Sequence, residues 1–561
     1  MRTSVLIILL VSSIALSWWA SYLSLVKLPA ADVWQHVSLI EQAAVGHLSL
    51  DNLLSKHNQL HFIPVPKLVY ALDLILASGS GLLTAGISAL FTLVCCLCLA
   101  RMIRDIDALD PSEKNWLVLL IASWLTCIIQ WESFVNPANL QWSGLNAGLA
   151  MMAMGLRQRP VWLTAGALLS LGCGAPWWLL LLAYSLLMAS RNTLLTGGSL
   201  LVAAALLWEC INLFWLRRYA PLPMLAMAQV LPVSSDQLHS IITLYFENPV
   251  GFYLGWLKNL LLFITRFTLP PVDRWLPDNA LIWLLPLPVA AYLTLVNTRQ
   301  QWRGFTFLAT AALLTGLAAG FVRAQMPGAY TLRFANTGLL FTSACFVLGY
   351  GLCRPASWRK YCWWTFAMLY SVLLLVFAIR EAADIVHGSN QRRLSQVAYA
   401  LDVHDARATS ETPYAPLMEL SYREINERKP VLAEHSLGIY SSLEHQIFTG
   451  QLALPIEETH CSYADTQIKA LRDDPAARKI IGHVMSDDGQ AMSSILIRDS
   501  HQRAIGYGIY QIAGLTLPEQ LRLPRHWAGF FRMPDDKQIE IIAYNPQQRC
   551  QTDVMALHAE Q

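Results

Sequence analysis

The feature that most constrains this chain is a series of long apolar segments that fill most of residues 1–380. The 561 residues are 55% hydrophobic and only 14% charged, whereas about a quarter of the residues in an average soluble protein are charged. An apolar helix of about 20 residues can cross a lipid bilayer. We therefore expect a polytopic α-helical membrane protein.

About eleven segments are long and apolar enough to cross a membrane. They lie near residues 4–26, 82–100, 115–131, 141–156, 161–175, 177–190, 194–215, 279–297, 304–322, 335–352 and 362–379. We interpret the first as a retained signal anchor with a cytoplasmic amino terminus. Two shorter segments, 62–78 and 251–268, are interrupted by charged residues. We expect them to lie on the outer face of the membrane or to re-enter it.

The basic residues between the apolar segments indicate the orientation, because Lys and Arg mark the cytoplasmic side. With a cytoplasmic amino terminus, most basic groups fall on that side. They are Arg101, Arg104 and Lys114, then Arg157 and Arg159, then Arg191, then Arg299 and Arg303, then Arg354, Arg359 and Lys360. Arg217 and Arg218 fall on the opposite side. The first outer loop, 28–80, and everything after Arg380 then lie outside the cytoplasm.

The composition changes after the apolar region. Residues 380–430 are charged, and short β-type runs separated by turn residues follow them. The runs lie at 479–485, 493–499, 504–511, 526–533 and 538–545. We therefore divide the chain into a membrane domain, 1–380, and a soluble periplasmic α+β domain, 381–561, that is β-rich toward its end.

The cysteines and the net charge bear on three questions: a disulfide, a structural zinc site and nucleic-acid binding. Of the 11 cysteines, only Cys461 and Cys550 lie outside the apolar region, and an oxidising compartment would allow them to pair or leave them as thiols. No Cys and His spacing is typical of a structural zinc site. A formal net charge of +2 without a basic run excludes a typical nucleic-acid binder.

The polar stretch 28–67 is the candidate active-site loop. It places Asp32 just beyond the first apolar segment, followed by Trp34, His57, Asn58 and His61. A carboxylate close to the membrane can have a raised pKa and act as a general base. The alternative for Asp32 is a solvated helix cap. The alternative for the imidazole and amide groups is simple contact with water.

Three charged residues in later outer segments could share this site. Glu132 follows Trp131 at the end of an apolar segment, where a solvated acid in an aromatic belt is the alternative interpretation. Arg323 and Arg333 flank an outer loop. Arginine is costly near a membrane and well suited to bidentate contacts with phosphate.

With these elements in place, the chain resembles the polytopic C-fold glycosyltransferases, the GT-C superfamily, and in particular bacterial inner-membrane members. These carry an acid followed by Trp, a histidine motif before a P-R-L element, a Q-W-E-N-F-like element and a late pair of arginines. The matching stretches are 32–34, 57–61 with 66–68, 130–134 with 141–142, 320–323 and 333–334. The chain departs from the pattern where Gln59 replaces an acid and Phe334 replaces Tyr.

The resemblance implies an enzyme that moves a sugar from a polyprenyl-phosphate carrier to an envelope glycan or lipid acceptor. Asp32 would deprotonate the acceptor hydroxyl, and Arg323 and Arg333 would neutralise the departing lipid phosphate. The residues expected to position donor or acceptor are Trp34, His57, Asn58, His61 and Glu132. The lipid-phosphate sugar is a substrate, no organic cofactor is expected, and the sequence leaves a metal requirement open.

Two other classes of protein stay open. A flippase or transporter of lipid-linked saccharides should show repeated halves and paired polar residues within its helices, but the sequence shows no internal repeat and only Glu209 in the middle of an apolar segment. A non-catalytic envelope assembly protein would tolerate the loss of Asp32. The sequence does not separate a polymerase or ligase from a single-sugar transferase.

Overall fold

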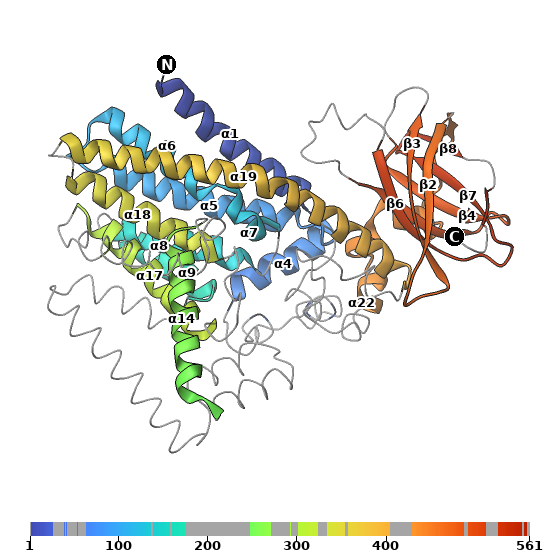
Figure 1. Cartoon of the computed structure of the whole chain (residues 1–561), viewed down its shortest axis with the longest axis horizontal. Helices are drawn as coiled ribbons and strands as arrows, with labels where there is room; N and C mark the ends of the chain where they lie inside the picture. Colours follow the sequence, from blue (N-terminus) through green and yellow to red (C-terminus); the bar gives the residue numbers. More distant parts are fainter. Residues whose placement is uncertain are drawn as a thin grey trace.

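The structure is a computed structural model with a helical part and a β-rich part joined by one long helix (Figure 1). It describes residues 2–25, 63–135, 139–156, 160–175, 247–270, 301–323, 334–353, 357–403, 429–459, 461–486, 492–511, 525–551 and 555–557, with Leu39, Glu41, Leu53 and Tyr292. All structural statements below concern these residues.

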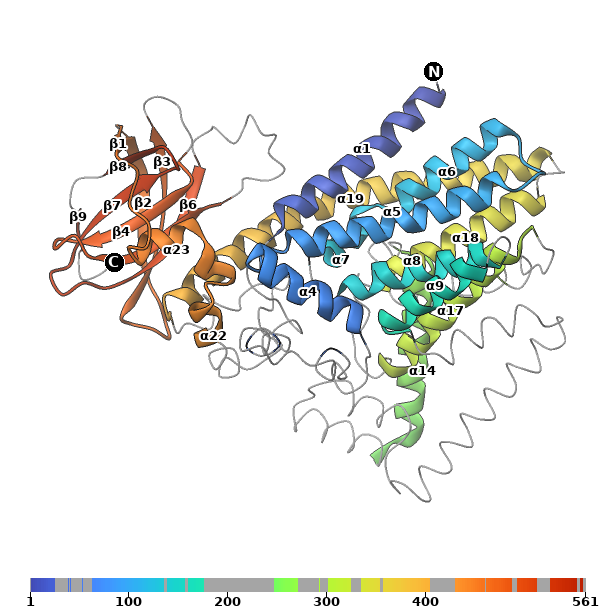
Figure 2. The same ribbon diagram turned by 180° about the vertical axis from the view of Figure 1, so that it is seen from behind.

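The helical part follows the apolar segments of the sequence. Its helices are α1 (Arg2–Leu23), α4 (Pro64–Ala77), α5 (Leu82–Arg104), α6 (Pro111–Leu125), η2 (Ile128–Gln130), α7 (Trp131–Val135), α8 (Leu140–Gly155), α9 (Pro160–Gly172), α14 (Pro249–Thr268), α17 (Arg303–Arg323), α18 (Ala335–Cys353) and α19 (Ser357–Ala400). Figure 2 shows α5, α8 and α9 from the other side.

The number of candidate membrane spans is smaller than expected. Among the described residues, three helices, α5, α17 and α19, are long and apolar enough to cross a bilayer. The expected spans at α6, α8 and α9 form helices of 15, 16 and 13 residues, which are shorter than the usual span of about 20 residues. The expected spans at 177–190, 194–215 and most of 279–297 lie outside the described residues.

Prolines and capping side chains set several helix boundaries. Pro111 opens α6, and the Glu113 carboxylate accepts a hydrogen bond from the backbone N–H of Asp110 at 3.2 Å. The buried carboxylate of Asp73 in α4 accepts from the N–H groups of Gly81 at 2.9 Å and Leu83 at 2.8 Å. Asp73 thus caps α5, because the first N–H groups of a helix have no partner within it.

Several of the described basic residues lie together at one end of the helical part. Arg101 and Arg104 lie in the last turn of α5, and the Lys114 ammonium donates to the Arg104 carbonyl at 2.7 Å. Arg303 begins α17 beside this end, because a Cβ on its neighbour Gly304 would lie 2.7 Å from the Met102 sulfur. These residues belong to two of the basic groups that we expect on one side of the membrane.

The opposite end of the helical part faces the carboxyl-terminal region. The Ser389 hydroxyl of α19 donates to the carbonyl of Leu23 at the end of α1, at 3.2 Å. The backbone N–H of Gly438 donates to the carbonyl of Ser78 in the turn between α4 and α5, at 2.7 Å. The end of α1 and the α4–α5 turn therefore lie beside the β-rich part.

Helix α19 joins the two parts and contains the domain boundary expected from the sequence. It has 44 residues, or about 66 Å at 1.5 Å per residue. The boundary expected at residues 380–381 falls inside this helix. Apolar residues in its second, more charged half, such as Ile385 and Val397, are buried. Figure 1 shows α19 running from the helical bundle to the sheet.

The carboxyl-terminal region forms a β-sheet. The described strands are β1 (Glu457–Glu458), β2 (Cys461–Ala470), β3 (Ala477–Ser486), β4 (Ser494–Asp499), β5 (Ala504–Tyr510), β6 (Arg525–Arg532), β7 (Gln538–Tyr544), β8 (Gln548–Gln551) and β9 (Met555–Ala556). They form one sheet in the order β1-β8-β7-β4-β5-β6-β3-β2, with β9 on β7. The runs predicted from the sequence are confirmed as β3 to β7.

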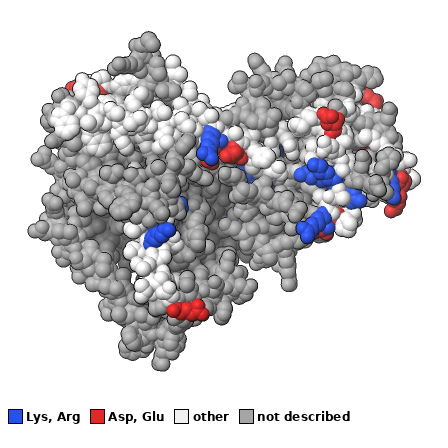
Figure 3. Space-filling view, viewed as in Figure 1, with Lys and Arg blue, Asp and Glu red and all other residues white. Residues whose placement is uncertain are grey.

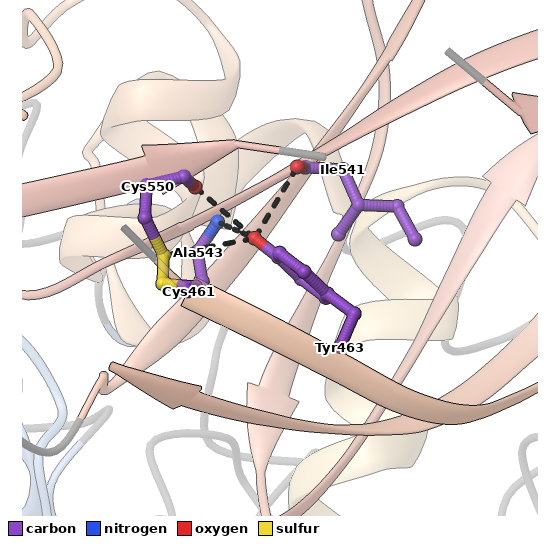
Figure 4. Close-up of a disulfide and its surroundings, with 5 residues drawn as sticks. All are labelled: Cys461, Tyr463, Ile541, Ala543 and Cys550. Atoms are coloured by element: carbon purple, nitrogen blue, oxygen red, sulfur yellow. Dashed lines mark hydrogen bonds between the residues drawn. A yellow bond between two sulfur atoms is a disulfide. The ribbon is translucent and has the colours of Figure 1, made fainter. Parts of the chain in front are cut away.

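The sheet is rolled so that strands from opposite ends of its order meet. Cys461 of β2 and Cys550 of β8 form a disulfide, with their Cα atoms 5.9 Å apart. Beside it, the Tyr463 hydroxyl donates to the Cys550 carbonyl and accepts from the Ala543 N–H, each at 3.1 Å (Figure 4). The disulfide and the tyrosine thus close the sheet around an interior lined by residues such as Ile480, Ile541 and Phe531.

The outer face of the sheet is covered by helices. Leu394 and Val397 near the end of α19, with Leu401 just beyond it, pack against Tyr507 and Phe530. Two short helices, α22 (Lys429–Glu434) and α23 (Leu443–Phe448), precede the strands with the turn η7 (Gly438–Ser441) between them, and Ile447 of α23 packs on a neighbouring part of this face. On the face shown in Figure 3, described charged side chains are sparse over the helical part and denser over the β-rich part.

Candidate functional site

The described residues contain only part of the site expected from the sequence. Asp32, Trp34, His57, Asn58, His61 and Arg333 lie outside them. Glu132 belongs to α7 and Arg323 is the last residue of α17, so the backbones of these two residues are placed. The described neighbours of the motif segments show how these segments are arranged.

Helix α7, which carries Glu132, is held between α1 and α19. The Phe134 ring lies 4.6 Å from the Trp18 ring of α1. The Arg392 guanidinium of α19 lies 5.1 Å from the centre of the Trp131 ring, and both residues are buried. A desolvated cation over an aromatic face is a favourable contact. The last turns of α1, before the loop with Asp32, therefore lie beside the segment with Glu132.

A buried polar contact joins α7 to the start of α18. The Asn336 side-chain amide donates to the Ser133 hydroxyl, and the Thr337 hydroxyl donates to the side-chain carbonyl of Asn146 in α8 at 3.0 Å. Asn336 is three residues beyond Arg333 in the sequence. The two motif segments that contain Glu132 and Arg333 are thereby tied together at their described residues.

An aromatic cluster brings two further motif segments, 141–142 and 320–323, next to Phe334. It is formed by Trp142, Phe263, Phe267 and Phe334. The Phe334 ring lies 5.0 Å from Trp142 and 5.2 Å from Phe263. Helix α17 reaches the same cluster near its end, because a Cβ on Gly320 would lie 2.8 Å from the Phe263 ring. Four of the short motifs, 130–134, 141–142, 320–323 and 333–334, thus have described residues in one connected layer.

A cavity of about 360 Å³ lies where the helical part meets the β-rich part. We call it the junction cavity. It is lined by Tyr22, Leu23, Leu25, Ser80, Leu82, Arg393, Gln396, Ile439, Ser442, Glu444 and Ile509. Leu25 is the last described residue before the candidate active-site loop. The cavity therefore opens beside the point where that loop leaves α1.

The lining of the junction cavity combines an ion of each sign with an aromatic surface. Arg393 donates to the Tyr510 carbonyl at 3.4 Å, and the Glu444 carboxylate accepts from the Ser494 hydroxyl at 2.8 Å. Tyr22 is 61% exposed and stacks on Trp19, with ring centres 5.8 Å apart. A concave site with apolar walls and a few fixed polar groups is typical of small-molecule binding sites.

Sequence reasoning missed Arg393, Gln396 and Glu444. These residues lie in the charged stretch after residue 380, where polar side chains usually form solvated helix faces. They line a cavity because α19 continues beyond the bundle and α23 folds back beside it. No local pattern in the sequence signals this arrangement.

A histidine beside the cavity predicts a pH effect on stability. His445 packs against Tyr440, Phe448 and Tyr507, and this burial, with the nearby charge of Lys429, lowers its pKa to about 4. A histidine in the unfolded chain has a pKa of about 6.5. The unfolded state therefore binds the extra proton first, and stability should fall as the pH drops from about 6.5 toward about 4.

We expect a lower thermal unfolding midpoint for the β-rich part at pH 5 than at pH 7.5. His445→Phe should reduce this difference, because phenylalanine fills the same aromatic surroundings without titrating. An equal difference between the two pH values in the variant and the unmodified protein would contradict this assignment.

Comparisons with known proteins supply no further information on the site. No protein family model, no curated protein and no solved structure matches this chain. Among the described residues, no group of three or more His, Cys, Asp or Glu side chains is arranged to hold a metal ion.

Proposed function

We propose that this protein is a membrane glycosyltransferase of the GT-C type. It would transfer a sugar from a polyprenyl-phosphate carrier to an envelope glycan or lipid acceptor. The observation that carries the proposal is the meeting of motif segments from α7, α8, α17 and α18 beside the last turns of α1. These segments are far apart in the sequence, and a transferase with residues from separate loops requires such a meeting.

The proposed chemistry divides the roles among the motif residues. Asp32 removes the proton of the acceptor hydroxyl, which attacks the anomeric carbon as the bond to the lipid phosphate breaks. Arg323 and Arg333 neutralise the charge that develops on the departing phosphate. Trp34, His57, Asn58, His61 and Glu132 position donor and acceptor.

The junction cavity is the proposed acceptor site. It adjoins the start of the loop with Asp32, and its Tyr22 face, Arg393 and Glu444 offer stacking and hydrogen bonds to a polyhydroxylated molecule. The proposal places the cavity at the periplasmic face of a bacterial inner membrane. It also retains about eleven spans, several of which would involve residues outside the described ranges.

Substitution of the phosphate-binding arginines tests the leaving-group role. Arg333→Ala should lower sugar transfer by about 10²–10³-fold, the usual loss when one donor to a developing negative charge is removed. The measurement is the release of polyprenyl phosphate by purified full-length protein in detergent. Arg303→Ala is the matched control, because Arg303 lies at the opposite end of α17 from Arg323, away from the proposed phosphate site.

The same assay separates the three functional classes. A transferase consumes the lipid-linked sugar in detergent, where there is no membrane to cross. A flippase leaves the donor intact under these conditions, and a non-catalytic assembly protein leaves it intact in every condition. If the donor stays intact in the presence of a complete set of envelope acceptors, the proposed transferase function is wrong.

A further inference from the structure

Two histidine side chains are in contact on the outer surface of the sheet, with their rings tilted by 46°. His483 of β3 and His526 of β6 are direct partners in the antiparallel ladder. Their Nε2 atoms are 3.1 Å apart and their ring centres 3.7 Å apart. The two residues are 43 positions apart in the sequence, so no sequence spacing reveals the pair.

An aspartate stands behind this pair. The Asp465 carboxylate lies 3.6 Å from Nδ1 of His483, whereas His526 contacts Nε2 of the same ring. Asp465 occupies an irregularity in β2 between Ala464 and Gln467, with a positive φ of 53°. The extra residues of a bulge redirect side chains, and here the bulge brings the carboxylate toward the imidazole.

The nitrogen separation is close to that of a metal ion bound by two imidazoles, whereas the ring centres, 3.7 Å apart, have to open to about 5 Å before both lone pairs face one ion. With metal–nitrogen bonds of about 2.0–2.1 Å, two nitrogens of a tetrahedral site are about 3.3 Å apart, close to the 3.1 Å observed. A histidine that binds a metal usually gives its second N–H to a carboxylate, which orients the ring. Asp465 is placed for that role on His483.

The pair is accessible from solvent. Val484 and Trp527, the neighbours of the two histidines along their strands, belong to the interior of the rolled sheet. Side chains alternate along a strand, so His483 and His526 point outward. His483 keeps 27% of its side-chain surface exposed, and Asp465 keeps 77%.

We propose that His483 and His526 form an open binding site for a divalent transition-metal ion, with Asp465 as the residue that orients His483. Imidazole nitrogens favour Cu²⁺, Ni²⁺ and Zn²⁺ over Mg²⁺ and Ca²⁺. Each imidazole binds the metal as a neutral ring through Nε2 with its proton on Nδ1, so a proton held on either Nε2 before binding moves through solvent to Nδ1 of the same ring. Water or an oxygen atom of a bound molecule completes the coordination.

The site lies close to the junction cavity. On β6, His526 is two residues from Ala528, whose partner on β5 is Ile509, a lining residue of the cavity. Ala528 and Ile509 share the outer face of the sheet with the histidines. Two residues along a strand correspond to about 7 Å, so a bound metal would lie near the wall of that cavity.

Binding of Cu²⁺ alone to the full-length protein in detergent tests this inference. The protein is prepared without a polyhistidine tag. The Cu²⁺ electron paramagnetic resonance spectrum should show splitting from two nitrogen ligands. Zn²⁺ should displace the Cu²⁺ only at a higher concentration, following the usual affinity order, and Mg²⁺ should not displace it.

Substitutions of the proposed residues show which side chains bind the metal. His483→Gln and His526→Gln should each remove the two-nitrogen spectrum, and Asp465→Asn should weaken binding by about tenfold. His501→Gln, in the exposed turn between β4 and β5, is the matched control and should bind as the unmodified protein does. Circular dichroism of each variant verifies that the domain is folded. An unchanged spectrum in folded His483→Gln and His526→Gln proteins would overturn the proposal.

Discussion

Asp32→Asn should reduce sugar transfer by about 10²–10⁴-fold, because a positioned general base contributes a factor of this size. Asparagine keeps the shape of the side chain but cannot accept the proton of the acceptor hydroxyl. The variant should still bind the lipid-linked donor, since the proposed phosphate contacts come from Arg323 and Arg333. The measurement is the turnover of donor to product by purified full-length protein.

Asp51→Asn provides the matched control for this variant. It makes the same chemical change in the same polar stretch, 28–67, at a residue with no proposed role in the chemistry. Its turnover should stay close to that of the unmodified protein. Equal activity of the Asp32→Asn protein and the Asp51→Asn protein would show that Asp32 is not the base.

Loss of the Cys461–Cys550 disulfide should cause the largest change in stability. The two cysteines are 89 residues apart in sequence, and closing a loop of that length stabilises the folded state by about 4.5 kcal/mol in the chain-entropy description. Cys461→Ala with Cys550→Ala should lower the unfolding midpoint of the β-rich part by about 10 °C. Differential scanning fluorimetry with and without reductant measures this change.

Cys362→Ala is the control for the disulfide prediction, because Cys362 is an exposed free cysteine in α19. Its midpoint should equal that of the unmodified protein, and reductant should lower both midpoints equally. A midpoint that does not respond to reductant in the unmodified protein would contradict a stabilising role for the disulfide.

The strands of the β-rich part were largely predictable. The runs at 479–485 and 538–545 alternate in β-branched and polar residues between turn signals, and such local patterns suffice to predict a strand. Strand β2 was missed, since its Tyr463, Thr466 and Ile468 are diluted by polar residues and a bulge. The rolled shape of the sheet depends on the contact of Tyr463 with β7 and β8, which no local pattern encodes.

The helices were less completely predictable. Hydropathy located α5 and α17 well, but the predicted segments 115–131 and 161–175 run beyond the ends of α6 at Leu125 and of α9 at Gly172. It also divided α19 at residue 380, because the charged residues that follow hide the buried stripe of Ile385 and Val397. A helix that changes its surroundings along its length carries two different sequence patterns.

The candidate site was predictable only as a set of motifs. The resemblance singled out 130–134, 141–142, 320–323 and 333–334, and the described residues of these segments do meet. The junction cavity was not predictable, because Arg393 and Glu444 come together only through the packing of α19 and α23 against the sheet. Residues that are distant in the sequence come together through tertiary packing, and local sequence patterns do not predict such packing.

The central claim is that Asp32, Arg323 and Arg333 share one aqueous pocket that holds the lipid phosphate. The most direct test is an electron cryomicroscopy structure of the full-length protein in lipid nanodiscs with added polyprenyl phosphate. The account predicts phosphate density in contact with both Arg323 and Arg333, with the Asp32 carboxylate lining the same cavity. Phosphate bound elsewhere, or Asp32 separated from both arginines without a connecting cavity, would contradict it.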